Sequence, residues 1–213
     1  MNTIEKEVSY NATNSYSTLN TVSKNTKNVW LVCHGIGYLS RYFLKYFDTL
    51  DAEENYIIAL QAQSKYYLGS EYRHVGASWL TKENTEKEIE NVMRYFDAVL
   101  KAEKIPSDTN LIVLGYSQGV SVISRYVAKR KLECSQLVLL SGGIPKELNN
   151  QDFKFLKGKT KVSFIYGSQD EYLTEAYMVD SKKRFYELFG DSGTIFTFDG
   201  KHEVKKEEIN KLV

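Results

Sequence analysis

The chain has 213 residues, of which 42% are apolar and 26% charged, a composition typical of soluble globular proteins. Its 28 basic and 27 acidic side chains give a net charge of +1, too small to attract nucleic acid or an anionic membrane surface over long range. No segment approaches the roughly 20 apolar residues of a membrane span, and the first ten residues lack the apolar run of a secretory signal.

The predicted elements begin with strands. Residues 4–10 and 14–20 alternate polar and apolar side chains around "NATN", which predicts an antiparallel hairpin. "NVWLVCHG" at 28–35 is a continuous apolar run, suited to a strand that is covered on both faces. A helix over residues 41–50 and a buried strand over 55–61 follow. Residues 62–81 read as a long polar and aromatic loop.

The rest of the chain alternates helices and buried strands. Apolar residues at steps of three and four from Ile89 to Leu100 predict an amphipathic helix. Further helices are predicted after Ser117, around residues 178–188 and over 203–213. Buried strands are predicted at 110–116, 136–142 and 161–167, and the last strand at 193–200. This alternation predicts an α/β fold in one domain, residues 1–213, with a mostly parallel central sheet and helices on both faces.

The cysteines and histidines argue against disulfides and metal ligation. Cys33 and Cys134 lie in or beside apolar strand-like runs, which predicts two buried free thiols in a reducing cytoplasm. None of the three histidines is spaced from a cysteine or from another histidine as zinc ligands are. We expect a cytoplasmic protein with no metal, no cofactor, no nucleic-acid partner and no membrane span; the oligomeric state is not predicted.

One serine lies at a junction typical of a nucleophile. Ser117 follows the strand "LIVLGY", precedes an apolar helical pattern and is flanked by Gly115 and Gly119. A sharp strand-to-helix turn lifts its side chain out and brings the strand end against the first helical turn, so the residues two before and two after must be small. The alternative is a chance Gly-x-Ser-x-Gly string. The surrounding pattern favours a catalytic Ser117.

A serine nucleophile needs a histidine base and an acid that orients it. In folds with such an elbow the chain order is nucleophile, acid, histidine, and His202 is the one histidine beyond Ser117. Asp170 follows the strand ending at Gly167 and is the favoured acid, although aspartate is also common in turns. Glu171 is the adjacent alternative. Asp180, Asp191 and Asp199 are less favourably placed.

Two backbone amides are predicted to bind the oxyanion. One is the amide of Gln118, which follows the nucleophile, and the other is the amide of Ile36 in the glycine-containing loop "HGIG". His34 is expected to brace this loop. Gly35 and Gly37 also partly match a dinucleotide fingerprint, but the next strand ends in Gln61 instead of an acidic residue, so we set that interpretation aside.

The substrate pocket is expected to be open, because residues 142–160 are too few for a helical lid. Side chains near the strand ends could line it, although packing in the core or exposure on the surface is the ordinary role of each. The predicted substrate-binding residues are Tyr38, Trp79, Leu80, Tyr172 and Leu173.

Together these motifs resemble the carboxylesterase/phospholipase branch of the α/β-hydrolase superfamily, which includes acyl-protein thioesterases. The likeness runs from about residue 29 to 202 and rests on "HGIG", "GYSQG", "SGGIP", "YGSQDEYL" and "KHEV". It implies an α/β-hydrolase fold without a large cap domain, and Ser117, Asp170 and His202 as the triad. The chain departs from the family pattern in "LQAQSKYY", in "ASWL" and at Lys201, so substrate preference does not carry over.

The predicted activity is a serine hydrolase that cleaves carboxylic esters or thioesters of short to medium acyl chains through an acyl-enzyme. Its partner would then be a small-molecule or acyl-chain ester. A peptidase or lyase on the same fold is the alternative within enzymes. A non-catalytic ligand-binding protein that keeps the fold is the alternative from another class.

Overall fold

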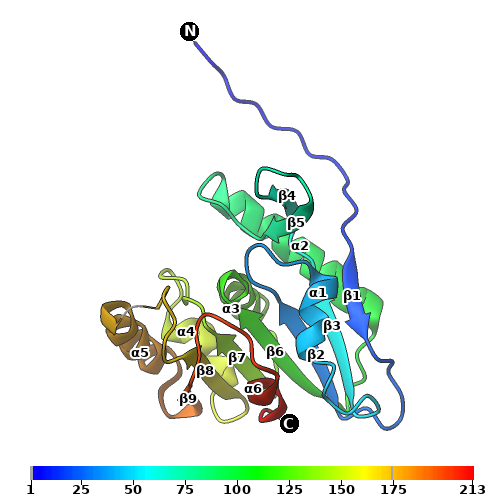
Figure 1. Cartoon of the computed structure of the whole chain (residues 1–213), viewed down its shortest axis with the longest axis vertical. Helices are drawn as coiled ribbons and strands as arrows, with labels where there is room; N and C mark the ends of the chain where they lie inside the picture. The colour runs from blue at the N-terminus through cyan, green and yellow to red at the C-terminus, as the bar shows by residue number, and fades with distance from the viewer. Residues whose placement is uncertain (1, 174) are drawn as a thin grey trace.

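The computed structural model describes residues 2–173 and 175–213. Its main sheet has seven strands in the order β1-β3-β2-β6-β7-β8-β9 (Figure 1). β1 pairs antiparallel with β3, and all other neighbours are parallel. These strands are β1 (Tyr16–Leu19), β2 (Asn28–Cys33), β3 (Asn55–Leu60), β6 (Asn110–Tyr116), β7 (Gln136–Leu140), β8 (Lys161–Gly167) and β9 (Gly193–Phe198). The mostly parallel sheet predicted from the sequence is confirmed.

Helices cover both faces of this sheet, as predicted. The helical elements are α1 (Ser40–Phe43), η1 (Leu44–Tyr46), α2 (Thr85–Glu103), α3 (Gln118–Arg130), α4 (Asn150–Phe153), η2 (Lys154–Leu156), α5 (Glu175–Phe189), η3 (Gly190–Ser192) and α6 (Lys206–Asn210). One face packs against α2, α3, α4 and α5, and the other packs against α1, η1 and α6. Alternate residues of each strand enter the two cores: Leu31 of β2 lies in one and Trp30 in the other.

The N-terminal hairpin predicted from the sequence is wrong. Residues 2–15 form no strand, and Ile4 and Val8 are 77% and 87% exposed. β1 instead joins the edge of the main sheet beside β3. The residues before it pass the start of α2, where Glu7 pairs with Lys87, and then extend away from the sheet (Figure 1). The alternating pattern of residues 4–10 has no second strand or core to cover its apolar side.

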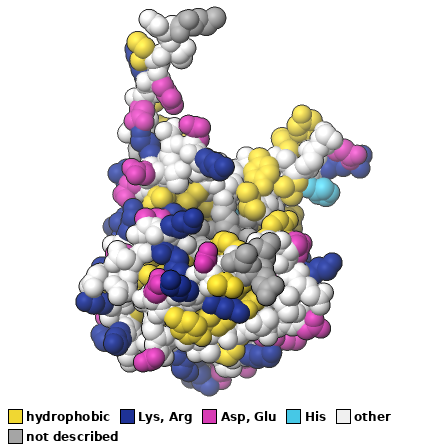
Figure 2. All heavy atoms as spheres, turned by 90° about the vertical axis from the view of Figure 1, so that its left-hand side faces the viewer, with side chains coloured by type: hydrophobic (Ala, Val, Ile, Leu, Met, Phe, Trp, Pro, Cys, Tyr) yellow, Lys and Arg dark blue, Asp and Glu magenta, His cyan; other side chains and the backbone are white. Residues whose placement is uncertain are grey.

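The long loop predicted over residues 62–81 contains a separate hairpin. β4 (Ser64–Leu68) pairs antiparallel with β5 (His74–Ser78). Figure 2 shows hydrophobic side chains gathered on a projection of the surface. The exposed apolar side chains of the hairpin are Tyr66, Tyr67, Leu68, Tyr72 and Val75. A hydrogen bond of 2.9 Å from the Gly37 amide to the Ala77 carbonyl fixes the hairpin against the loop after β2.

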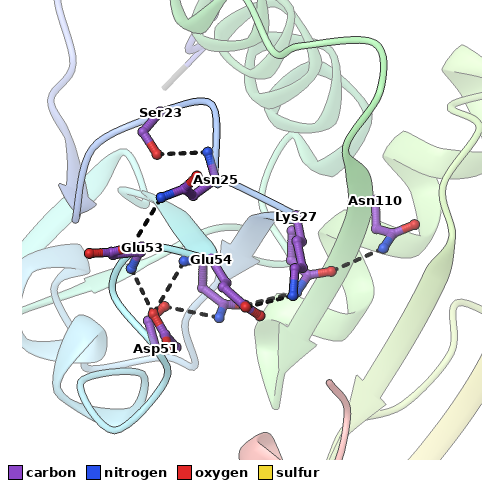
Figure 3. A network of polar contacts seen from close by, with 9 residues as sticks. Ser23, Asn25, Lys27, Asp51, Glu53, Glu54 and Asn110 are labelled. Carbon is purple, nitrogen blue, oxygen red and sulfur yellow. Dashed lines mark hydrogen bonds and ion pairs between the residues drawn. The ribbon is translucent and has the colours of Figure 1, made fainter.

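A polar network holds the amino ends of the parallel strands together (Figure 3). Asp51 accepts hydrogen bonds from the amides of Glu53 and Glu54, and Glu54 pairs with the Lys27 ammonium at 2.5 Å. The Lys27 carbonyl accepts from the Asn110 amide at 2.8 Å. These contacts join the starts of β2, β3 and β6. This edge of the sheet is opposite the carboxyl ends of the strands, which carry the residues predicted to react.

Both cysteines are buried free thiols, as predicted. Burial raises the pKa of the Cys134 thiol to about 12, so this group stays protonated and unreactive at neutral pH. No helix within the described part of the chain is both long and apolar enough to cross a bilayer.

Candidate active site

Ser117 occupies a strained turn between β6 and α3. Its φ of 53° and ψ of −118° lie outside the ordinary regions for a non-glycine residue. The flanking glycines make this turn possible: a Cβ on Gly115 would lie 2.6 Å from the Gly119 carbonyl carbon, and one on Gly119 would lie 2.2 Å from the Cys33 carbonyl oxygen. The Ser117 amide donates to the Leu140 carbonyl at 2.9 Å, which fixes the turn to the neighbouring strand.

The fold brings the three predicted catalytic side chains into one hydrogen-bonded line. Ser117 Oγ lies 2.9 Å from His202 Nε2, and His202 Nδ1 lies 2.8 Å from Asp170 Oδ2. The residues follow β6, β9 and β8, so they come from loops at the carboxyl edge of the sheet. An ionised Asp170 can only accept, so the proton of a neutral His202 sits on Nδ1 and leaves Nε2 free to accept from Ser117.

Asp170 is held by burial and by a second hydrogen bond. Its carboxylate is fully buried, whereas the His202 side chain is 15% exposed. The other carboxylate oxygen, Oδ1, accepts from the Tyr172 amide at 3.0 Å. Of the other acids considered, Glu171 is exposed and Asp199 accepts from Gln169. Asp170 is therefore the acid that contacts the imidazole.

The loop after β2 lies directly beside Ser117. A Cβ built on Gly35 would be 3.1 Å from the Ser117 Cβ. Among the residues that the structure describes, none accepts a hydrogen bond from the amide of Ile36 or of Gln118. The Gln118 amide begins α3, where backbone N–H groups have no acceptor within the helix. Neither amide therefore has an acceptor among the described residues, and the Ile36 side chain is 52% exposed.

The Gln118 side chain has a separate role that the sequence did not predict. Its Oε1 accepts from the Trp79 amide at 2.8 Å, and its Nε2 donates to the Leu80 carbonyl at 2.8 Å. These bonds fix the segment after β5 against the start of α3. The motif Gly-x-Ser-x-Gly gives no signal for this contact, because the partners lie about 40 residues away in the sequence.

The prediction that Trp79 lines the pocket is corrected by its position. Trp79 is 1% exposed, and its indole N–H donates to the His34 carbonyl at 2.7 Å. Its ring centroid lies 5.0 Å from that of His34 and 5.6 Å from that of Phe96. The indole therefore belongs to the core beneath the site, because its polar atom finds a backbone acceptor there.

The other predicted pocket residues lie nearer the surface. Tyr172 is exposed, and its ring stands edge-on to His202 with centroids 4.8 Å apart. Tyr38 is half-buried and its hydroxyl lies 3.1 Å from that of Tyr46. Leu80 and Leu173 are half-buried against the core. A hollow of about 750 Å³ lies elsewhere, between residues 8–10 and the start of α2.

His34 braces the loop after β2, as expected. The ring is fully buried; Nδ1 lies 2.7 Å from the Gly35 carbonyl and Nε2 accepts from the Ala62 amide at 3.2 Å. Burial lowers the pKa of His34 from 6.5 to about 4, although the bond to Gly35 opposes the shift. The neutral ring is therefore the form that the folded protein accommodates.

This burial predicts acid-sensitive stability. Below pH 6.5 the unfolded chain protonates His34 and the folded chain does not until about pH 4, so the free energy of unfolding falls in that window, by about 3 kcal/mol in total. Urea unfolding at pH 7.5, 6 and 4.5 measures this. The variant His34→Gln should show a shallower decline, and His74→Gln, which removes an exposed histidine, should follow the wild type. An equal decline in all three proteins would contradict the assignment.

Comparisons with known proteins agree with this architecture. The family model described as phospholipase/carboxylesterase matches residues 14–213. Acyl-protein thioesterase 2 from Zea mays superposes with a TM-score of 0.70 at 14% identity, over 93% of this chain and 95% of that one. Esterase PE8 gives 0.66 at 17% identity, over 93% and 95%. The Bacillus cereus carboxylesterase gives 0.65 at 17% identity, over 92% and 90%. Comparison with curated proteins gives no significant match.

Proposed function

The chain belongs to the phospholipase/carboxylesterase family of α/β-hydrolases, and we propose that it hydrolyses carboxylic esters or thioesters with Ser117 as the nucleophile. One observation carries the proposal: the Ser117 hydroxyl, the His202 imidazole and the Asp170 carboxylate are joined by hydrogen bonds of 2.9 and 2.8 Å. An unassisted serine hydroxyl is a poor nucleophile at neutral pH, and a positioned imidazole overcomes this.

In the first half-reaction Ser117 is acylated. His202 Nε2 takes the hydroxyl proton while Ser117 Oγ attacks the acyl carbonyl carbon, and the carbonyl oxygen becomes an oxyanion. The free amides of Ile36 and Gln118 donate to that oxygen, and the start of α3 adds a favourable dipole. Collapse of the intermediate breaks the bond to the leaving group, and the alcohol or thiol departs with the proton from His202.

In the second half-reaction water releases the acid. His202 takes a proton from water, the resulting hydroxide attacks the acyl carbon, and Ser117 Oγ leaves with that proton. Throughout, the buried Asp170 keeps the imidazole in the required tautomer and stabilises its charged form. The second hydrogen bond to Asp170, from the Tyr172 amide, keeps the carboxylate aimed at His202.

The substrate is proposed to be an ester or thioester with a short to medium acyl chain. The exposed ring of Tyr172 stands beside His202, and Tyr38, Leu80 and Leu173 offer further half-buried surface. Trp79 is left out of this pocket because it is buried. Structural neighbours include an acyl-protein thioesterase and a carboxylesterase, so both leaving-group classes are included.

A fluorophosphonate probe tests this function. The Ser117 oxygen is expected to attack phosphorus and displace fluoride, so mass spectrometry of a digest should find one adduct, on the peptide that contains Ser117. His202→Ala should abolish labelling, because it removes the base. A parallel panel of p-nitrophenyl esters and acyl thioesters of graded length should show turnover that falls for long chains. Absence of labelling in the folded wild type, with saturable ligand binding, would favour a non-catalytic protein instead.

A further inference from the structure

We propose that Tyr116, the residue before the nucleophile, is a positioning residue that holds the His202 segment and the loop after β2 at their working distances from Ser117. The inference rests on the proposed hydrolase function. It adds a residue that works through its contacts with the base and with the loop after β2 and does not itself react.

The hydroxyl of Tyr116 anchors the base through its backbone. Tyr116 Oη donates to the His202 carbonyl at 2.9 Å. His202 lies between β9 and α6 in a segment without regular structure, so no sheet or helix hydrogen bond holds its position. Tyr116 is 2% exposed, and burial raises the pKa of its phenol well above the ordinary value. The phenol therefore remains a donor throughout the useful pH range.

The ring of Tyr116 contacts both the His202 imidazole and the loop after β2. Its centroid lies 5.3 Å from that of the His202 imidazole, and it also stacks with Phe43 of α1 at a centroid distance of 6.2 Å. A Cβ on Gly35 would lie 3.0 Å from Tyr116 Cδ1, so the backbone of the loop after β2 rests against the ring edge. One side chain thus touches both the segment of the base and the loop that offers the Ile36 amide.

Through Tyr116, the end of β6 positions the nucleophile, the His202 segment and the loop after β2. Tyr116 is the last residue of β6 and Ser117 is the next residue, so the anchor and the nucleophile move together. A displacement of about 1 Å between reacting groups can cost on the order of a hundredfold in rate. A side chain that only filled the core would need its ring and not its hydroxyl. The two roles are therefore separable by removing the hydroxyl alone.

The test compares Tyr116→Phe with Tyr126→Phe. Tyr126 of α3 is a matched control, because it is 3% exposed and its hydroxyl also makes one 2.9 Å hydrogen bond, to Asp97. We expect Tyr116→Phe to lower kcat for p-nitrophenyl acetate roughly tenfold, about the value of one hydrogen bond, with KM changed less than twofold. Tyr126→Phe should lose similar or greater stability in urea unfolding and keep the wild-type kcat. Equal kcat in the wild type and Tyr116→Phe would overturn the proposal.

A second readout does not depend on activity. With three histidines in the chain, NMR spectra of protein labelled with ¹⁵N-histidine contain three imidazoles, and His202→Ala identifies the one from His202. Tyr116→Phe should shift or broaden the Nδ1–H resonance of His202 through faster solvent exchange, while Tyr126→Phe leaves it unchanged. An unchanged resonance in Tyr116→Phe would refute the anchoring role even in an inactive protein. A wild type that is inactive but shows this effect would refute the hydrolase function alone.

Discussion

Replacing Ser117 by alanine is expected to lower kcat for ester hydrolysis about 10⁶-fold, as removal of the nucleophile does in other serine hydrolases. The variant keeps the free amides of Ile36 and Gln118 and the surrounding surface, so it should still bind substrate and retain a small rate above the uncatalysed reaction. Hydrolysis of p-nitrophenyl acetate by purified protein measures the loss. Urea unfolding of the same sample establishes that the variant is folded.

Two companion variants make the interpretation specific. Ser124→Ala also removes a serine hydroxyl from this region, but the Ser124 hydroxyl is buried on α3 without a partner among the described residues. That variant should therefore retain wild-type turnover. The double variant Ser117→Ala/His202→Ala should be no slower than either single variant, because the two side chains act as one unit. A Ser117→Ala protein that kept more than a hundredth of the wild-type kcat would exclude Ser117 as the nucleophile.

The sheet could be predicted because its strands are buried on both faces. β2 and β3 are buried at every position, so their sequences are near-continuous apolar runs. Their short length and their β-branched and aromatic residues distinguish them from a buried helix. The stripe from Ile89 to Leu100 likewise predicted α2, since one of its sides faces the core. In both cases a hydrophobic pattern among residues close together in the chain identifies the element. The order of strands and helices therefore follows from the sequence.

The two hairpin errors have opposite physical causes. Residues 4–10 alternate as a strand does, but a strand is stable only when another strand pairs with it, and the chain offers none there. β4 is exposed at every position, so it lacks the buried face that gives a strand its pattern. The pairing of β4 with β5 has a weaker signal, the five residues from Gly69 to Arg73 between two β-rich runs.

The candidate site also contains residues that could be predicted from the sequence and contacts that could not. Ser117, Asp170 and His202 could be selected because the chemistry requires their residue types and this fold places them in a fixed chain order; the structure joins them by hydrogen bonds. The supporting contacts of Gln118 and Tyr116 could not be predicted. Both depend on backbone carbonyls, at Leu80 and His202, and every residue type carries such a carbonyl. Only the folded positions reveal which one is used.

The second large effect is expected from Gly119→Ala. Gly119 is the second residue of α3, and helix propensity alone predicts that alanine there stabilises the protein by about 1 kcal/mol. The added Cβ, however, would lie 2.2 Å from the Cys33 carbonyl oxygen and 2.8 Å from that of His34. Both contacts are with backbone, which cannot rotate away as a side chain can. We expect a net loss of about 3–5 kcal/mol in the free energy of unfolding.

Urea unfolding of Gly119→Ala beside Gly69→Ala tests whether the clash or the backbone conformation determines the loss. Gly69 has a φ of +75° with nothing within 4 Å of a built Cβ, so its replacement should cost only about 1 kcal/mol. Because the clash falls on the residues that lead into the loop after β2, a folded Gly119→Ala protein should also react slowly with fluorophosphonate. If Gly119→Ala were as stable as the wild type, α3 could not begin against β2, and the turn that presents Ser117 would need a different geometry.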